Sequence, residues 1–200
     1  MKQVLLSFLL LNIFLNCNNS EGRKNRNNNL QNKEYLQPKV NVDNNVNDCD
    51  TIKILKNLKN QLLNQQTNNI AGYENIPRYL VDFYKNKESN EIDNDSINKQ
   101  DFKENYKYIF SDDFLHGLSM INVENLKNKG RFNIANIQSY NFTPNVKYDY
   151  NVNYKGTIME ISILYKFPSD DDSLDSETSI IYVFKFVDCK MVIDKVIMAG

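Results

Sequence analysis

Several residue types that mark common functional sites are rare in this chain of 200 residues. It contains three cysteines and one histidine, with no HxH, HExxH or CxxC spacing, which argues against a zinc site built on short-spaced ligands. Tryptophan is absent, but 12 tyrosines and 11 phenylalanines supply the aromatic surface that a hydrophobic core needs. The formal net charge is -1, whereas a general nucleic-acid-binding protein carries a basic excess. We therefore expect no nucleic-acid partner, no metal and no cofactor.

The longest apolar run of the chain lies at its N-terminus. Lys2 precedes a run from Val4 to Leu15 that is interrupted by Ser7 and Asn12. This run is shorter than the roughly 20 apolar residues that cross a bilayer. It has the proportions of a secretory signal peptide. Cys17 stands at the point where apolar chain gives way to polar, asparagine-rich chain.

The segment "IFLNC", which ends at Cys17, resembles a relaxed lipobox of bacterial lipoproteins. The resemblance implies a signal peptide at 1–16, a lipid on the Cys17 sulfur, and a membrane-anchored protein of the bacterial cell envelope, on its outer surface or periplasmic face. Leu15 departs from the usual small residue, and Asn16 is a tolerated residue before the cut. The alternatives are a plainly secreted protein with an ordinary cleaved signal, and an uncleaved anchor. In a secreted protozoan protein, the sequons at Asn18, Asn94 and Asn141 would also matter.

Residues 17–49 are rich in asparagine and show little apolar periodicity. A segment of this composition cannot bury enough apolar surface to offset its ordering entropy. We interpret it as a disordered tether between the lipid and a folded domain at 50–200. Arg23, Lys24 and Arg26 form a small basic cluster in this tether, which either contacts anionic headgroups or is simply solvated.

Residues 50–130 show a helical pattern. Asp50 is a natural N-cap for a helix whose apolar residues recur at three- and four-residue spacing, at Ile52, Leu55, Leu58 and Leu62. Pro77 suits the first turn of a second helix. A third helical region carries the apolar stripe Phe102, Tyr106, Ile109 and Phe110. Ser111 starts a short helix, and Gly130 closes the last one.

Residues 131–200 show the period of two that is typical of strands. One apolar face is formed by Val146, Tyr148, Tyr150, Val152 and Tyr154, and another by Met159, Ile161, Ile163, Tyr165 and Phe167. Two further runs, 177–188 and 190–200, pair naturally through a tight turn. The pattern predicts an α+β fold in which N-terminal helices pack on one face of a four- to five-stranded, mainly antiparallel curved sheet.

The element order and the ending "YVFKFVDCKMVIDKV" resemble the NTF2-like (cystatin-like α+β cone) superfamily over about residues 50–200. Met191–Val196 stands where members of that superfamily carry a "W-x-I-x-x-I"-like strand, with Met191 in the place of Trp. Members include isomerases, cyclases, dehydratases and non-catalytic binding modules, so the resemblance does not decide the function.

Three features offer candidate chemistry beside ordinary structural roles. His116 with Asp112 and Asp113 is either an acid–base or metal-binding group, or a capped helix start with one satisfied histidine. The acidic run 169–177 is either a calcium loop without the usual glycine, or a solvated connection. The tyrosine-rich strand faces either line a ligand pocket or pack as a sheet face.

The remaining cysteines, Cys49 and Cys189, could form a disulfide in an exported protein, although sequence alone does not bring them together. The carboxylates Asp149 and Glu160 alternate onto the wet face of the sheet, and Asp194 lies among apolar residues. We therefore expect a non-catalytic binding or interaction module, with a protein or a small apolar ligand as partner. The alternative is an NTF2-like enzyme that performs isomerase- or dehydratase-type proton transfer.

Overall fold

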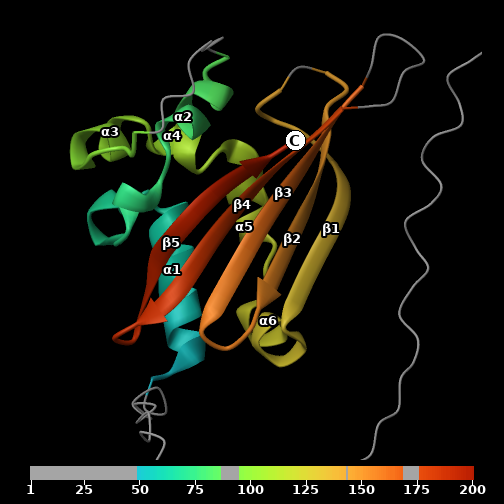
Figure 1. Ribbon diagram of the computed structural model, residues 1–200. Helices are drawn as coiled ribbons and strands as arrows, with labels where there is room; N and C mark the ends of the chain where they lie inside the picture. The colour runs from blue at the N-terminus through green and yellow to red at the C-terminus, as the bar shows by residue number, and fades with distance from the viewer. Residues whose placement is uncertain (1–48, 87–94, 143, 169–175) are drawn as a thin grey trace, which may run out of the picture. The chain divides into compact units, whose positions relative to one another are not determined.

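The computed structural model describes residues 49–86, 95–142, 144–168 and 176–200. The expected signal peptide, the lipid site at Cys17 and the tether up to residue 48 lie outside the described residues. Within the described part, the chain forms six α-helices followed by a five-stranded antiparallel sheet that stays open (Figure 1). The α+β class predicted from the sequence is therefore confirmed.

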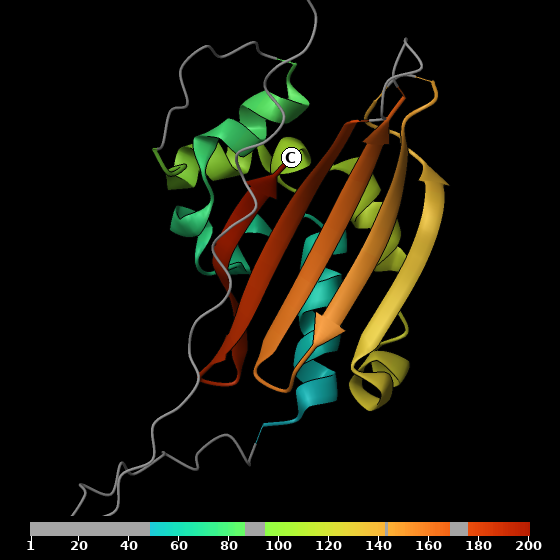
Figure 2. The ribbon, with the colours of Figure 1, turned by 45° about the vertical axis from the view of Figure 1, so that its right-hand side comes forward.

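Helix α1 spans Thr51–Leu63 and lies along one face of the sheet, as Figures 1 and 2 both show. It begins where it does because the Asp50 carboxylate accepts a hydrogen bond from the Lys53 amide at 3.1 Å, which satisfies one free donor of the first turn. Its buried side chains follow the helical period. They are Ile54, Leu55, Leu58 and Leu62.

The other helical elements are short, and polar caps set their ends. Asn98 and Asp101 form a capping box at the start of α3, and the Ser111 hydroxyl accepts from the Phe114 amide at the start of α5. Gly130 ends α6 at a φ of 68°, a left-handed conformation that glycine adopts at low cost. The elements are η2 Thr67–Asn69, η3 Tyr73–Asn75, α2 Arg78–Tyr84, α3 Lys99–Glu104, α4 Tyr106–Ile109, α5 Asp112–Ser119 and α6 Val123–Lys129.

Each of the five strands pairs with the next one along the chain. The sheet order is therefore β1-β2-β3-β4-β5, with every pair antiparallel. The described helices lie on one side of the sheet, and none of them covers its other face (Figure 2). The strands are β1 Arg131–Gln138, β2 Lys147–Tyr154, β3 Ile158–Phe167, β4 Ser176–Val187 and β5 Lys190–Ala199.

Strands β2 and β3 alternate as their sequences predict. Every second side chain is buried against the helices, from Tyr148 to Tyr154 in β2 and from Met159 to Tyr165 in β3. The residues between them are half-buried or exposed on the open face. The register is confirmed because Tyr150 lies opposite Ile163 and both point into the core.

Strand β5 departs from simple alternation. Lys195 lies opposite Val183, and Ile193 lies opposite the next residue, Phe184, so Asp194 is an additional residue without its own partner. This β-bulge moves the inward face by one residue, so that Val196 follows Ile193 into the core and Lys195 stays exposed.

The outer edge of β5 is covered by the segment between η2 and η3. The Ile193 amide donates to the Ala71 carbonyl at 2.9 Å, and the Asn75 side chain donates to the Ile193 carbonyl at 2.8 Å. Gly72 is needed here because a Cβ at this position would lie 2.1 Å from the Ile193 carbonyl oxygen. Near the start of β5, Cys189 forms a disulfide with Cys49, whose Cα lies 5.5 Å away.

Candidate functional site

Tyrosines dominate the inner face of the sheet. Tyr148 and Tyr150 from β2, Tyr165 from β3 and Tyr182 from β4 are fully buried. The Tyr182 hydroxyl donates to the Ile109 carbonyl at 2.6 Å, which ties the end of α4 to strand β4. These side chains therefore belong to the packed core.

A chain of hydroxyl groups links this face to helices α2 and α5. The Tyr165 hydroxyl lies 3.1 Å from that of Tyr84, which in turn accepts from Ser111 at 3.3 Å. Burial raises the pKa of Tyr84 to about 12 and that of Tyr165 well above its usual value. Both phenols consequently stay protonated at neutral pH and can donate hydrogen bonds.

Asp113 places a carboxylate in this buried region. Its oxygens accept from the Ser139 hydroxyl at 2.6 Å and from the Tyr140 amide at 2.7 Å, while its own amide donates to the Asn141 side chain at 3.0 Å. Burial raises the pKa of Asp113, and the hydrogen bonds from Ser139 and Tyr140 oppose that rise. Both carboxylate oxygens therefore bind residues of the connection between β1 and β2. Asp113 holds this connection against α5.

His116 lies at the rim of the same network. Its Nδ1 is 3.0 Å from the Tyr148 hydroxyl, and its ring meets the edge of Tyr140, a side chain that is 64% exposed. The interpretation of His116 as a satisfied histidine on a capped helix therefore agrees with the geometry. No group of three or more His, Cys, Asp or Glu side chains among the described residues could hold a metal ion.

The buried network has the residue types of a proton-transfer site. Asp113 and Tyr165 have raised pKa values, as an enzyme of this kind would need. However, aromatic rings fill the space beside them, with Phe142 at 4.9 Å and Tyr84 at 6.4 Å from the Tyr165 ring. The two clefts described below are lined by other residues. The network is therefore packed with aromatic rings and is not part of either of these two clefts.

The carboxylates predicted to face solvent lie on the open face of the sheet. Asp149 accepts from Lys166 at 2.7 Å and from the Asn136 amide at 2.8 Å. Partial burial alone would raise the pKa of Asp149, but these two donors hold it below its usual value. Asp194 forms an ion pair with Lys185 at 2.5 Å, and Glu160 lies half-buried on the same face. These positions are outside both clefts.

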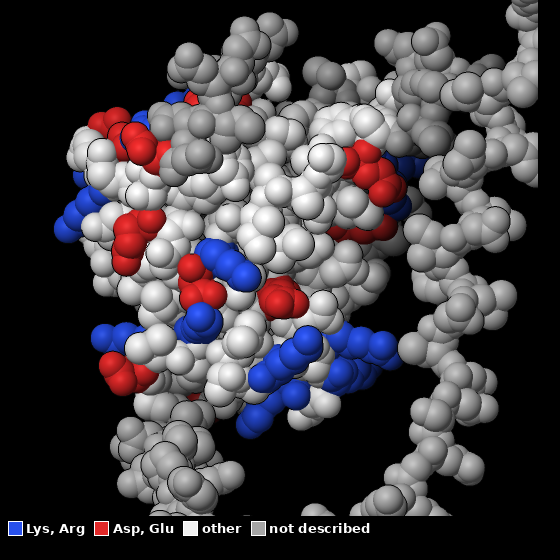
Figure 3. All heavy atoms as spheres, in the orientation of Figure 1, with Lys and Arg blue, Asp and Glu red and all other residues white. Residues whose placement is uncertain are grey.

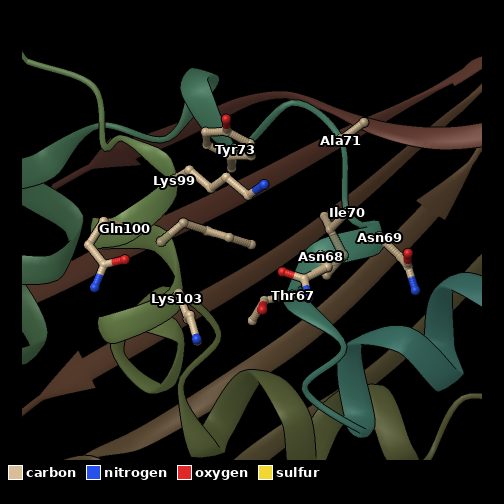
Figure 4. Close-up of a pocket in the computed structure, with 10 residues that line it drawn as sticks. Thr67, Asn68, Asn69, Ile70, Ala71, Tyr73, Lys99, Gln100 and Lys103 are labelled. Atoms are coloured by element: carbon tan, nitrogen blue, oxygen red, sulfur yellow. The ribbon is translucent and has the colours of Figure 1, made fainter.

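A surface cleft of about 540 Å³ lies between η2 and α3 (Figure 4). Lys99 and Lys103 are one helical turn apart on α3 and line the same cleft, together with the amides of Asn68, Asn69 and Gln100. The other lining residues are Thr67, Ile70, Ala71, Tyr73 and Phe102.

Aromatic rings and cations give this cleft a distinct chemical character. The rings of Tyr73 and Phe102 stack with their centroids 5.5 Å apart. Lysine ammonium groups and amide N–H groups are hydrogen-bond donors, and none of the lining residues is acidic. The cleft is therefore suited to a small ligand that combines an anionic group with an apolar or planar part.

A smaller cleft of about 310 Å³ lies between α1 and the turn before β5. Its lining includes Cys189, Lys190 and Met191 beside residues of α1 such as Asn57 and Leu58. Cys189 is bonded to Cys49, which precedes α1, so the lining cysteine is part of a disulfide.

Several sequence-derived candidates fall outside the described residues. They are Cys17, the sequons at Asn18 and Asn94, and residues 169–175 of the acidic run; Glu177, at the end of that run, is exposed on β4. Asn141 is half-buried, and its side chain is engaged with the Asp113 amide. None of the described helices is long and apolar enough to cross a membrane.

Comparison with protein-family models, with curated proteins and with solved structures gives no match to this chain. The proposed function therefore rests on the residues of this chain alone.

Sequence reasoning missed the cleft and the role of Asp113. Lys99 and Lys103 at a spacing of four would have indicated a shared helix face. Nothing local, however, shows that the η2 segment lies opposite that face. Asp113 could be singled out as a carboxylate next to a helix cap, but its partners Ser139 and Tyr140 are more than 25 residues away in the sequence.

Proposed function

We propose that this chain is an exported lipoprotein whose folded domain is a non-catalytic binding module, with the cleft between η2 and α3 as its ligand site. The observation that carries the binding role is the contrast between a filled interior and an open surface cleft. Aromatic side chains pack around the buried tyrosine–aspartate network, whereas hydrogen-bond donors and aromatic residues line a surface cleft of about 540 Å³.

The membrane anchor is supported by the sequence of the N-terminus. An apolar run too short to span a bilayer ends at Cys17, where a lipoprotein carries its lipid. A cell-envelope location follows from this proposal. Growth with a palmitate analogue should label the wild-type protein and leave Cys17→Ala unlabelled. Equal labelling of both proteins, or labelling of neither, would contradict the lipid at Cys17.

We also propose that the folded domain is related to the NTF2-like superfamily. This relationship is supported by the order of helices before strands and by a single open sheet packed on α1. Both binding modules and enzymes fit this architecture, so the fold does not decide between them. The enzyme alternative would need a substrate-sized space beside Asp113 or His116, and the clefts lie elsewhere.

Binding at the cleft can be tested with a simple probe. The chain from Asn18 to Gly200 retains every described residue and lacks the apolar N-terminal run. Titration of this isotope-labelled chain with phenylacetate, an aromatic carboxylate, should shift NMR signals of η2 and α3. The double variant Lys99→Gln and Lys103→Gln should weaken binding about tenfold or more, since two charge-assisted hydrogen bonds are lost.

The matched control for this titration is Lys127→Gln with Lys129→Gln. It removes the same two charges from exposed helical positions on α6, outside the cleft. The control should bind phenylacetate as the parent chain does. Unchanged signals of η2 and α3 at millimolar probe, or an equal loss in both variants, would refute the cleft as an anion site.

A further inference from the structure

Four basic side chains lie together at one end of the domain, and we call this group the basic end. Lys127 and Lys129 belong to the last turn of α6, Arg131 is the first residue of β1, and Lys155 lies in the turn between β2 and β3. All four side chains are exposed.

Backbone pairing holds these residues side by side. The Tyr154 amide donates to the Gly130 carbonyl at 2.7 Å, and Arg131 lies opposite Asn153. These contacts place the end of α6 next to the β2–β3 turn. Figure 3 shows Lys and Arg side chains gathered at the lower right, with no Asp or Glu among them.

The nearest acidic group on α6 already has a partner. Glu124 forms an ion pair with Lys56 of α1 at 2.5 Å. None of the described acidic side chains forms an ion pair with a residue of the basic end. Because the whole chain has a net charge of -1, the basic end is a local excess that the overall charge hides.

The basic end lies where the described chain begins. In a sheet of consecutive antiparallel strands, the β2–β3 and β4–β5 turns fall at the same end. Cys49 is bonded to Cys189 in the β4–β5 turn, and α1 starts immediately after Asp50. Figure 1 shows the start of α1, both turns and α6 at the same end of the sheet.

We propose that the basic end binds anionic phospholipid headgroups, so that this end of the domain rests on the membrane to which the chain is anchored. The orientation of the domain on the membrane depends on the proposed lipid at Cys17. Headgroup binding by the basic end does not depend on that lipid. A cluster of exposed cations is attracted to a negatively charged lipid surface, and the attraction weakens as salt screens it. Four cations on a chain with no net basic charge are few for a general nucleic-acid binder.

Vesicle sedimentation with the chain from Asn18 to Gly200 tests the proposal independently of lipidation. All proteins carry Arg23→Gln, Lys24→Gln and Arg26→Gln, so that the N-terminal cluster makes no contribution. The vesicles consist of phosphatidylcholine alone, or of phosphatidylcholine with about one third phosphatidylglycerol. The parent chain should sediment with the anionic vesicles at low salt, and it should be released at about 0.5 M NaCl.

Two charge-matched variants locate the binding surface. The quadruple change Lys127→Gln, Lys129→Gln, Arg131→Gln and Lys155→Gln should weaken binding to anionic vesicles about tenfold or more. The control changes four lysines outside both the basic end and the cleft, Lys85, Lys107, Lys147 and Lys195, to Gln and should retain binding.

Three results would overturn the proposal: equal binding of the two variants, equal binding to neutral vesicles, or stronger binding to duplex DNA than to anionic vesicles at the same salt. Palmitate labelling at Cys17 is measured separately. If Cys17 proves to carry no lipid, the vesicle experiment still tests headgroup binding by the basic end.

Discussion

At the scale of single residues, the buried tyrosine hydroxyls differ in whether they have a partner. Tyr182 donates to the Ile109 carbonyl, and Tyr84 and Tyr165 bond to each other. The Tyr150 hydroxyl is the one buried side-chain polar atom of the described residues that has no hydrogen-bond partner. A buried polar group without a partner costs free energy that its removal can recover.

We therefore predict opposite effects for two conservative substitutions. Tyr150→Phe should raise the free energy of unfolding by about 1 kcal/mol, because it removes an unpaired hydroxyl. Tyr182→Phe should lower it by about 1–2 kcal/mol, because it leaves the Ile109 carbonyl unpaired. Urea unfolding followed by circular dichroism measures both values, and a destabilised Tyr150→Phe would show that this hydroxyl has a partner in solution.

The sequence predicts which residues of β2 and β3 point inward, because alternation is a local property of a strand. It does not predict which hydroxyl finds a partner. The Ile109 carbonyl that accepts from Tyr182 comes from a helix end 73 residues earlier in the chain. Similarly, Asp113 is buried because Ser139, which lies much later in the chain, packs over it. No local sequence pattern predicts this long-range contact.

At the scale of secondary-structure elements, the disulfide fixes the start of α1 to the β4–β5 hairpin. Cys49 and Cys189 are 140 residues apart in the sequence, and the bond closes a loop that spans nearly the whole described domain. A long closed loop restricts the unfolded chain most, so its loss is expected to be costly.

Replacing both cysteines by alanine should lower the free energy of unfolding by about 4–5 kcal/mol in the chain-entropy model. The reference protein for this comparison carries Cys17→Ala, so that only the bonded pair differs. Urea unfolding of the oxidised reference, the reduced reference and the double-alanine variant measures the effect. If the oxidised and reduced forms unfold at the same urea concentration, the bond does not stabilise the fold.

Element boundaries followed from local chemistry where caps are present. Asp50, Ser111 and Gly130 mark helix ends at the expected positions. The β5 bulge was not predicted, because an extra residue is recognised only from its partner strand, where Val183 and Phe184 pair with residues on either side of Asp194. The number of strands, five, lies within the predicted range.

At the scale of the whole molecule, the buried tyrosines make the fold sensitive to alkali. Burial raises the pKa of Tyr84 to about 12 and that of Tyr150, Tyr165 and Tyr182 well above the ordinary value of about 10. Because these pKa values are higher in the folded state, the stability linked to them is complete below about pH 10. It is lost as the pH rises from there through the folded-state values.

We predict that the inner tyrosines ionise together with unfolding, at a pH above that of free tyrosine. The tyrosinate absorbance of these inner rings should appear in the same step as the loss of far-ultraviolet circular dichroism, at a pH above about 10. The same titration in concentrated urea should show every tyrosine ionising near pH 10. Full ionisation near pH 10 with unchanged circular dichroism would contradict the buried placement of these rings.

The two margins of the open sheet differ in how well they resist pairing with another chain. At β5, the Ile193 amide already donates to the Ala71 carbonyl, and Gly72 lies against the Ile193 backbone, so this margin is occupied at Ile193. At β1, the bulge between Ile134 and Ile137 and the left-handed Asn136 interrupt the regular ladder. An incoming strand would therefore find only short stretches of regular backbone at β1, which protects crowded copies of this domain from joining their sheets into aggregates.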